Sequence, residues 1–364
     1  MKNYILLIAS AALMSLLAAC TKQTPAVGQE REIAFQVANY AATKANVAFS
    51  NADFGVFDWH HTEDGTVTPI MKNERVGQKG TEWKTLDNTY YWPKSGSLNF
   101  IAYSPYSADK APAVTETSIA FKAYEVGADD LMYADRASEK TRNESTYTDL
   151  SGANGVPTLF HHALAKLSFR VKANFTEYVN PDNKDDKTTW TVTLQKATLS
   201  GLYNTGDLQL SLGQDNAAWT TTGWTPDTKK TAKELALVNA ADGVVLSTEP
   251  KDLYPDEAGK AQSFYVLPQA LAKEAQKIAL KFHIRTALSN GKVLEEDYDH
   301  TLDLQAISSL AEWKMNQNII YTICIKPTAS VDPAHPDDPT DVIITFDPAQ
   351  MDWETVDATA TIQL

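Results

Sequence analysis

A chain of 364 residues is too long for one ordinary hydrophobic core, so its length favours about two domains. Its 46 acidic side chains outnumber its 32 basic ones, and the net charge of −14 disfavours nucleic acid and anionic lipid as partners. The only cysteines are Cys20 and Cys324, which excludes a fold held by several disulfides, so stability has to come from packed cores.

The first twenty residues carry the pattern of an export signal. Lys2 precedes an apolar run that ends in small residues directly before Cys20, which is typical of a secretory signal rather than a membrane span. Residues 17–20 resemble the lipobox of bacterial lipoproteins, which implies lipid on the Cys20 sulfur and cleavage before it. A plain signal peptide with a chance cysteine is the alternative. We therefore expect a signal peptide at 1–19 and a polar tether at 20–31.

Period-two alternation predicts strands after the tether. Ile33, Phe35 and Val37 alternate with small or polar residues, as in a strand that is buried on one face. The Asp-Gly pair that ends at Gly65 favours a hairpin turn, because these residues tolerate positive φ. We expect a first β-sandwich domain over residues 32–157.

A second block repeats the alternation. The alternate apolar residues of its clearest strand are Ala165, Leu167, Phe169 and Val171. Similar alternation recurs at residues 190–194, 278–284, 321–325 and 342–346. The pair Asn290-Gly291 predicts a hairpin. Residues 270–276 are the candidate for a short helix, with a turn as the alternative, and residues 304–312 are a weaker candidate. Many short strands with turns and little helix predict an all-β fold, with a second antiparallel sandwich over 158–364.

Two adjacent histidine pairs are the candidates for a metal site. His60-His61 and His161-His162 lie in strand-like stretches, where neighbouring side chains point to opposite faces and cannot easily bind one ion. Motifs for an activated nucleophile or a phosphate-binding loop are absent from the sequence. The sequence therefore predicts no enzyme, no metal and no cofactor.

Three further features have ordinary structural explanations. Residues 182–186 are rich in oxygen ligands but lack the glycine and distal glutamate of a calcium loop, which favours a solvated loop. Cys324 lies between two isoleucines and is expected to be a sheet thiol without chemistry. Trp219 and Trp224 could stack on sugars if exposed, but the favoured interpretation is that they cap the sandwich cores.

Several short motifs occur in a characteristic order along the chain. They are the lipobox at Cys20, residues 33–37 with 42–45, 90–93 with 98–103 and Pro105, 130–134, 160–167, Trp313 with Asn316 before the strand at Tyr321, and Ile344 and Phe346 before Trp353. Together they resemble the fimbrillin family, the lipoprotein-derived pilins of type V pili in Bacteroidota. The resemblance covers nearly the whole chain.

That resemblance implies a fold and a role. The fold would be all-β, with two tandem transthyretin-like antiparallel β-sandwich domains. The protein would be an outer-membrane lipoprotein precursor, anchored through lipid on Cys20, and then a structural and adhesive subunit of a cell-surface fimbrium. Its partners would be other pilin subunits. A host or glycan ligand stays open, and a surface glycan-binding β-sandwich lipoprotein is the alternative function.

The family also implies maturation by proteolysis in the loop after the first strand. Loss of that strand opens a groove, which a strand from the next subunit fills. The family usually has Arg-Ala at the cut site, whereas this chain has Lys44-Ala45 in the small, polar stretch 39–45. Lys44 is therefore the candidate cleavage site, and an uncut, anchor-like subunit is the alternative.

Residues 355–364 are the candidate donor strand. The apolar residues that alternate there are Val356, Ala358, Ala360, Ile362 and Leu364. A strand that adds to a sheet edge binds through main-chain hydrogen bonds and through pockets for alternate side chains. The alternative is that this segment pairs as an edge strand of its own domain.

Overall fold

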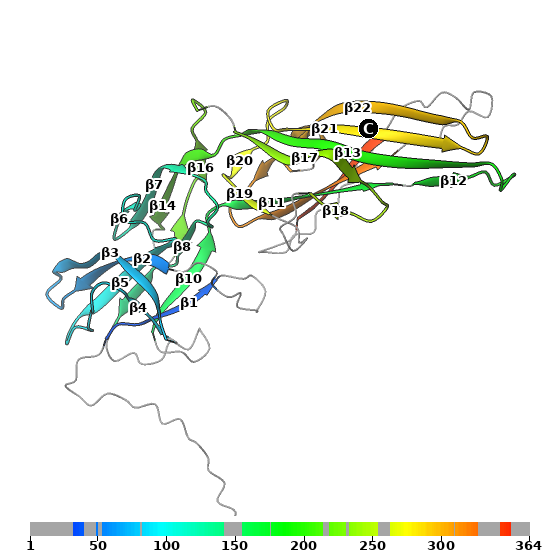
Figure 1. The fold of residues 1–364 in the computed structure, drawn as a ribbon. Coiled ribbons are helices and arrows are strands. Elements are labelled where there is room, and N and C mark those ends of the chain that lie inside the picture. Colours follow the sequence, from blue (N-terminus) through cyan, green and yellow to red (C-terminus); the bar gives the residue numbers. More distant parts are fainter. Residues whose placement is uncertain are drawn as a thin grey trace, which may run out of the picture.

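The computed structural model describes residues 32–39, 49, 53–80, 82–141, 155–174, 176–213, 218–230, 233–253, 263–308, 310–326 and 343–350. These residues form an elongated, nearly all-β molecule with two parts, which Figure 1 shows at lower left and upper right. Among them, no helix is long and apolar enough to span a bilayer.

The first part is built on an eight-stranded sheet that closes on itself. Its strands, in spatial order, are β2 (Asp53–His61), β3 (Val67–Lys79), β4 (Glu82–Thr85), β1 (Phe35–Asn39), β10 (Val156–His162), β8 (Met132–Ala134), β5 (Ser97–Ser104) and β9 (Ala137–Lys140). Because β2 also pairs with β5, the sheet forms a barrel-like ring. We call it the barrel. Its interior holds Phe35, Phe54, Val56, Phe100 and Phe160, among other buried residues.

A second layer covers one side of the barrel. Its strands are β6 (Ala113–Thr115), β7 (Ser118–Glu125), β14 (Thr205–Leu212), β15 (Trp219–Thr220) and β16 (Trp224–Pro226). A second core lies between the layers and includes Ile101, Tyr103, Phe121, Leu208 and Leu210. Strand β5 is therefore buried on both faces, which explains its continuous apolar run.

The second part is a sandwich of two five-stranded sheets. One holds β18 (Lys251–Asp252), β11 (Ala165–Ala173), β19 (Phe264–Val266), β24 (Asn318–Lys326) and β25 (Ile343–Gln350). The other holds β12 (Glu177–Val179), β13 (Lys187–Leu202), β17 (Lys233–Val245), β21 (Lys277–Leu288) and β22 (Val293–Asp303), and β20 (Gln269–Ala270) pairs with β23 (Glu312–Trp313). The predicted core residues Ala165, Leu167, Phe169 and Val171 are all buried between these sheets.

The all-β prediction is confirmed, with differences in detail. The pairings β1–β10 and β11–β24 are parallel rather than antiparallel, which the long connections between these strands allow. Strand β10 runs across residues 157–158, where the sequence suggested a domain limit, and β14 from the second block pairs with β7. The division into two tandem domains stays a prediction.

Local turn chemistry explains the hairpins and the helix. Gly65 and Gly291, each with a φ of +84°, sit in the predicted hairpin turns. Residues 270–276 form no helix: the end of β20 is followed by the turn that the sequence left open as the alternative, in which Glu274 has a φ of +63°. The short helix α1 (Leu304–Ile307) lies in the weaker candidate, where Asp303 caps it by accepting from the Gln305 N–H.

Candidate functional site

Strand β1 is held unequally on its two sides. Along β10 it forms a parallel ladder that runs from Phe35 opposite Val156 to Asn39 opposite Phe160. Along β4 the pairing is confined to Phe35 opposite Trp83. One edge of β1 therefore carries a full ladder and the other a single residue pair, although β1 is needed to close the barrel.

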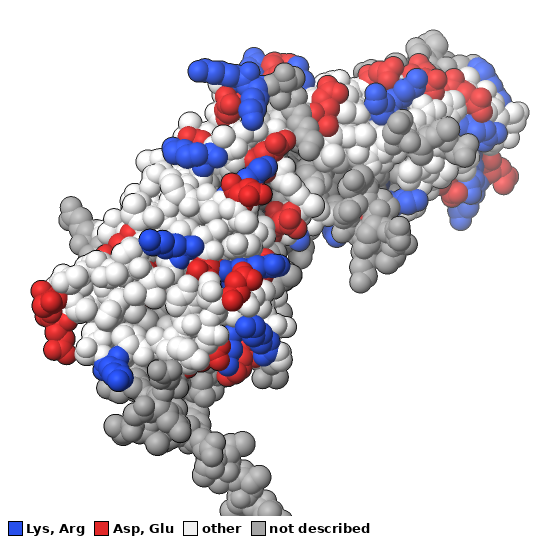
Figure 2. Space-filling model, turned by 60° about the vertical axis from the view of Figure 1, so that its left-hand side comes forward, with Lys and Arg blue, Asp and Glu red and all other residues white. Residues whose placement is uncertain are grey.

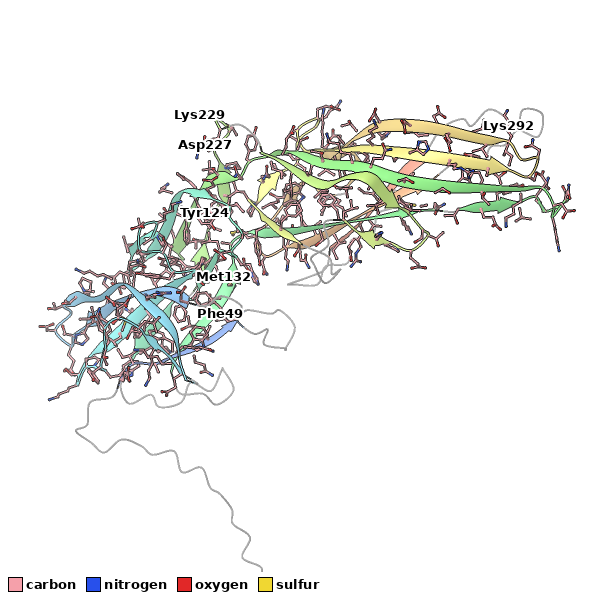
Figure 3. All side chains as sticks on the ribbon, viewed as in Figure 1. Phe49, Tyr124, Met132, Asp227, Lys229 and Lys292 are labelled. Carbon is pink, nitrogen blue, oxygen red and sulfur yellow. The ribbon has the colours of Figure 1, made fainter. Side chains whose placement is uncertain are left out.

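The side chains of this segment fill the barrel core. Phe35 is buried and meets Phe54 and Phe100 edge to face, with ring centroids 5.7 and 5.8 Å apart. Phe49, which Figure 3 labels near β1, stacks on Phe160 at 4.8 Å and meets Trp83 at 5.4 Å. Withdrawal of Phe35 would uncover aromatic rings on neighbouring strands, at about 1.5–3 kcal/mol for each large side chain exposed.

Backbone contacts anchor the start of β1. The Ile33 N–H donates to the Tyr90 carbonyl at 2.9 Å, and the Val156 N–H donates to the Ala34 carbonyl at 2.7 Å. Gly155 passes so close that a Cβ there would lie 2.7 Å from the Phe35 carbonyl carbon. A side chain at position 155 would therefore push β1 out of register.

Asp58 is an unusual group in the barrel wall. It lies on β2 opposite Met71 and Phe100, it is fully buried, and neither carboxylate oxygen has a partner at normal hydrogen-bond geometry. Burial raises the pKa of Asp58 to about 8, against a smaller lowering effect of the Trp59 backbone N–H. The carboxyl is therefore mostly protonated at neutral pH.

An edge strand of the second part is protected by charge. Among the described strands, β22 pairs with β21 alone, and there Asp297 contacts the His283 ring at 2.8 Å and Glu295 lies 3.4 Å from the Arg285 Nε. Charged side chains on an edge discourage the addition of another strand. Figure 2 shows basic and acidic side chains intermixed over both parts of the molecule on the face in view.

The residues predicted from the sequence to carry lipid, cleavage and strand donation lie outside the described residues. They are Cys20, Lys44, Ala45, Val356, Ala358, Ala360, Ile362 and Leu364. In the sequence, Lys44 lies between β1 and Phe49, which both contribute side chains to the barrel core. The candidate cleavage site therefore lies in the stretch that follows β1, the strand whose removal would open the barrel.

The histidine pairs diverge, as predicted. His60 contacts the Ser95 carbonyl, whereas His61 contacts Glu116 at 2.5 Å. The other pair also separates. His161 contacts Asp135 at 2.8 Å, and His162 contacts the buried Asp130 at 2.5 Å. Within the described part of the chain, no cluster of three or more suitable side chains could hold a metal ion.

The tryptophans and Cys324 have structural roles. Trp224 is buried and its indole N–H donates to the Ala163 carbonyl at 2.6 Å. Trp219 is half-buried and donates to the Ala134 carbonyl at 2.8 Å. Both rings cap the core between the layers, as favoured from the sequence. Cys324 is buried in β24, as expected for a sheet thiol.

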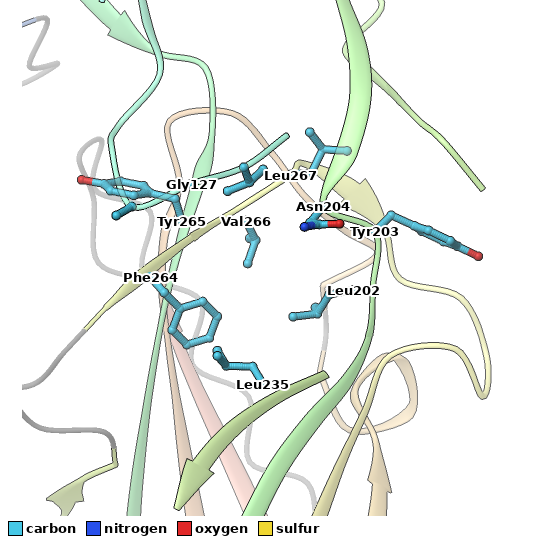
Figure 4. Close-up of a pocket in the computed structure, with 11 residues that line it drawn as sticks. Gly127, Leu202, Tyr203, Asn204, Leu235, Phe264, Tyr265, Val266 and Leu267 are labelled. Carbon is cyan, nitrogen blue, oxygen red and sulfur yellow. The ribbon is translucent and has the colours of Figure 1, made fainter. Parts of the chain in front are cut away.

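A cavity of about 320 Å³ lies where β13 leads toward β14 and passes β19. Figure 4 shows its mostly apolar lining, to which Leu202, Leu235 and Phe264 contribute. The polar side chains of the lining belong to Tyr203, Asn204 and Tyr265, and burial raises the pKa of the Tyr265 hydroxyl. Among the described residues, no Asp, Glu, Lys, Arg or His side chain lines this cavity, and its ionisable groups are the hydroxyls of Tyr203 and Tyr265.

The fold and this site define a class: an elongated β-sandwich protein whose first strand completes a barrel. The model of the family described as fimbrillin-like matches residues 42–353, so the chain belongs to that family. A fimbrial protein from Bacteroides vulgatus is similar in structure, with 17% identity, a TM-score of 0.57, and coverage of 89% of this chain and 100% of its own. The fimbrial anchor protein Mfa2 from Porphyromonas gingivalis matches with 10% identity, a TM-score of 0.31, and coverage of 89% and 97%. No curated protein matches the chain.

Proposed function

We propose that this chain is a structural and adhesive subunit of a cell-surface fimbrium, without catalytic activity, which assembles by strand exchange. Membership of the fimbrillin-like family and the fold of a fimbrial protein support this role. The observation that carries the assembly mechanism is the placement of β1. This strand closes the barrel, contributes Phe35 to its core, and is fully laddered only to β10.

In this proposal, cleavage after Lys44 frees the segment that contains β1. Its departure opens a groove between β4 and β10, with exposed main-chain groups and apolar pockets. A strand with alternating apolar side chains matches both, since the ladder binds its backbone and the pockets bind alternate residues. Residues 355–364 of another subunit have that alternation and are the proposed donor.

The same proposal covers export and anchoring. The chain is exported as an outer-membrane lipoprotein precursor through lipid on Cys20, and other pilin subunits are its partners. Because Cys20 and β1 both precede Lys44, one cut would remove the lipid together with the first strand. Membrane release and opening of the groove would then be one event.

Truncation tests the mechanism. Protein that starts at Ala45 should polymerise, as seen by size-exclusion chromatography and electron microscopy, whereas the same protein without residues 355–364 should stay a folded monomer. A matched control replaces Val356 and Ile362 by Asp, which keeps the length but removes the apolar face. Polymers that form without residues 355–364, or loss of the β-sheet circular-dichroism signal in the truncated monomer, would contradict the donor role.

A further inference from the structure

A polar cleft of about 1120 Å³ opens in the first part of the molecule. It lies where the core between the barrel and the second layer ends, at the end of β2, the start of β5 and the turn between β6 and β7. The side chains of Trp59 and Ile101 belong to the apolar interior of that space. At His61 and Asn99, two residues away on the same strands, the lining becomes polar.

Four side chains from four different elements converge in this cleft. The Glu116 Oε1 accepts from the Arg136 Nη2 at 2.7 Å and from the Asn99 Nδ2 at 2.7 Å, and it lies 2.5 Å from the His61 Nε2. The Glu139 backbone N–H donates to the Asn99 Oδ1 at 2.7 Å, which fixes the direction of the amide. The network is therefore rigid, and the Glu116 Oε2 stays outside it.

Arg136 shows that this network is not optimised for stability. Its side chain is 8% exposed, and its buried Nε has no hydrogen-bond partner. A buried donor without an acceptor is rare in native proteins and is destabilising. Rigid polar groups kept at such a cost are typical of a preorganised binding site.

The lining indicates the class of ligand. The lining holds the carboxylates of Glu63, Glu116 and Glu139 and the cations of Arg136 and Lys140, and the remaining side chains are mainly hydroxyls, with one amide and one imidazole. The three carboxylates would repel an anionic ligand, and the guanidinium would repel a cationic one. A sugar hydroxyl donates and accepts at once, so it can bridge a carboxylate and a guanidinium. We propose that this cleft binds the hydroxyl groups of a neutral saccharide.

This site is separate from the strand-exchange groove. Among the residues that the structure describes, none from β1, β4 or β10 lines the cleft, and its polar network uses β2, β5 and the turns before β7 and β9. Saccharide binding therefore does not depend on polymerisation. Failure of one proposal leaves the other standing.

Saturation-transfer NMR on the soluble protein from residue 21 tests the proposal, with the methyl glycosides of glucose, galactose and mannose as probes. At least one glycoside should receive saturation and bind measurably. Glu116→Gln keeps the side-chain size but removes the charge-assisted hydrogen bonds, and it should weaken binding about tenfold or more. Asp207→Asn is the matched control, since Asp207 forms an exposed ion pair with Lys122 in the same layer, and it should bind as the wild type does.

A second variant distinguishes loss of binding through a blocked cleft from loss of binding through misfolding. Thr117 is exposed in the lining and lies outside the Glu116 network, so Thr117→Trp should block the cleft and leave the thermal melting temperature unchanged. No saturation transfer to any of the three glycosides in the wild type overturns the proposal. Equal binding by wild type and Thr117→Trp also overturns it. Loss of polymerisation in Glu116→Gln, without glycoside binding by the wild type, would assign the cleft to a protein contact instead.

Discussion

The rings of Phe169 and Tyr321 stack face to face across the parallel pair β11–β24, with centroids 5.1 Å apart and planes inclined by 15°. The Tyr321 hydroxyl in turn accepts the indole N–H of Trp313 at 2.9 Å. Burial raises the pKa of Tyr321 to about 12, so this acceptor keeps its proton throughout the physiological range. The stack joins the two strands that run through the centre of the second part.

Phe169→Ala should therefore be strongly destabilising. The ring is buried and also stacks on Phe264 at 6.2 Å, so its loss removes transfer energy and leaves a cavity. The expected loss in the free energy of unfolding is about 3–5 kcal/mol, measured by urea denaturation. Val245→Ala is the control, because Val245 is 59% exposed and should change stability by about 0.5 kcal/mol or less. A comparable loss in both variants would contradict the assignment of Phe169 to the core.

Asp58 should make the protein less stable as the pH rises. Its pKa in the folded state is about 8, above the ordinary value of 3.8, so between these values the folded chain binds a proton that the unfolded chain has released. The contribution of this group to the free energy of unfolding then falls by about 1.4 kcal/mol per pH unit and levels off above the folded-state pKa.

Comparison with Asp58→Asn isolates this effect. Urea unfolding at pH 5 and pH 8 should show a wild-type loss of stability that the variant lacks. Asp64 serves as the control, because its pKa is shifted in the opposite direction. Hydrogen bonds from Thr62 and Thr66 lower this pKa to about 2. Asp64→Asn should therefore keep the wild-type decline between these two pH values. Equal pH dependence in wild type and Asp58→Asn would contradict an ionisable Asp58 in the core.

Lipidation should depend on Cys20 alone. Cys20→Ala should abolish incorporation of labelled palmitate in cells and leave the fold intact, since Cys20 belongs to the polar tether predicted from the sequence. Cys324→Ala is the matched control, because that thiol is buried in β24, and it should keep the label. Label that persists in Cys20→Ala would rule out this residue as the lipid site.

Maturation should depend on Lys44. N-terminal sequencing of the assembled protein from cells should start at Ala45, and Lys44→Ala should block assembly while export continues. Arg31→Ala is the control, because a cut there would precede β1 and leave the barrel closed. A blocked N-terminus at Cys20 in assembled fimbriae would instead indicate an uncut, anchor-like subunit.

Much of the fold could be predicted from local patterns. The alternation at Phe169 and the Asn-Gly turn at Gly291 gave strands and hairpins at the right places, because both signals act within a few residues. The pairing of β14 with β7 could not be predicted this way, since register between distant strands leaves no local period. The same holds for the parallel pairs.

The polar cleft shows the same limit. His61 stands out in the sequence as half of a histidine pair, but Asn99, Glu116 and Arg136 come from three other stretches with no shared spacing. Only the fold brings them together. The burial of Asp58 could not be predicted either, because an aspartate between Phe57 and Trp59 looks like an ordinary polar position of a half-buried strand.

The pairing of β14 with β7 also sets the order in which the first part can be completed. Until residues 205–212 are available, the barrel lacks a central strand of its cover, and Ile101, Tyr103 and Phe121 lack their packing partners Leu208 and Leu210. Because β11 and β13 precede β14 in the sequence, the first part is completed only after these strands of the second part have been synthesised. A truncated chain that ends before residue 205 would expose this apolar face and would be prone to aggregate.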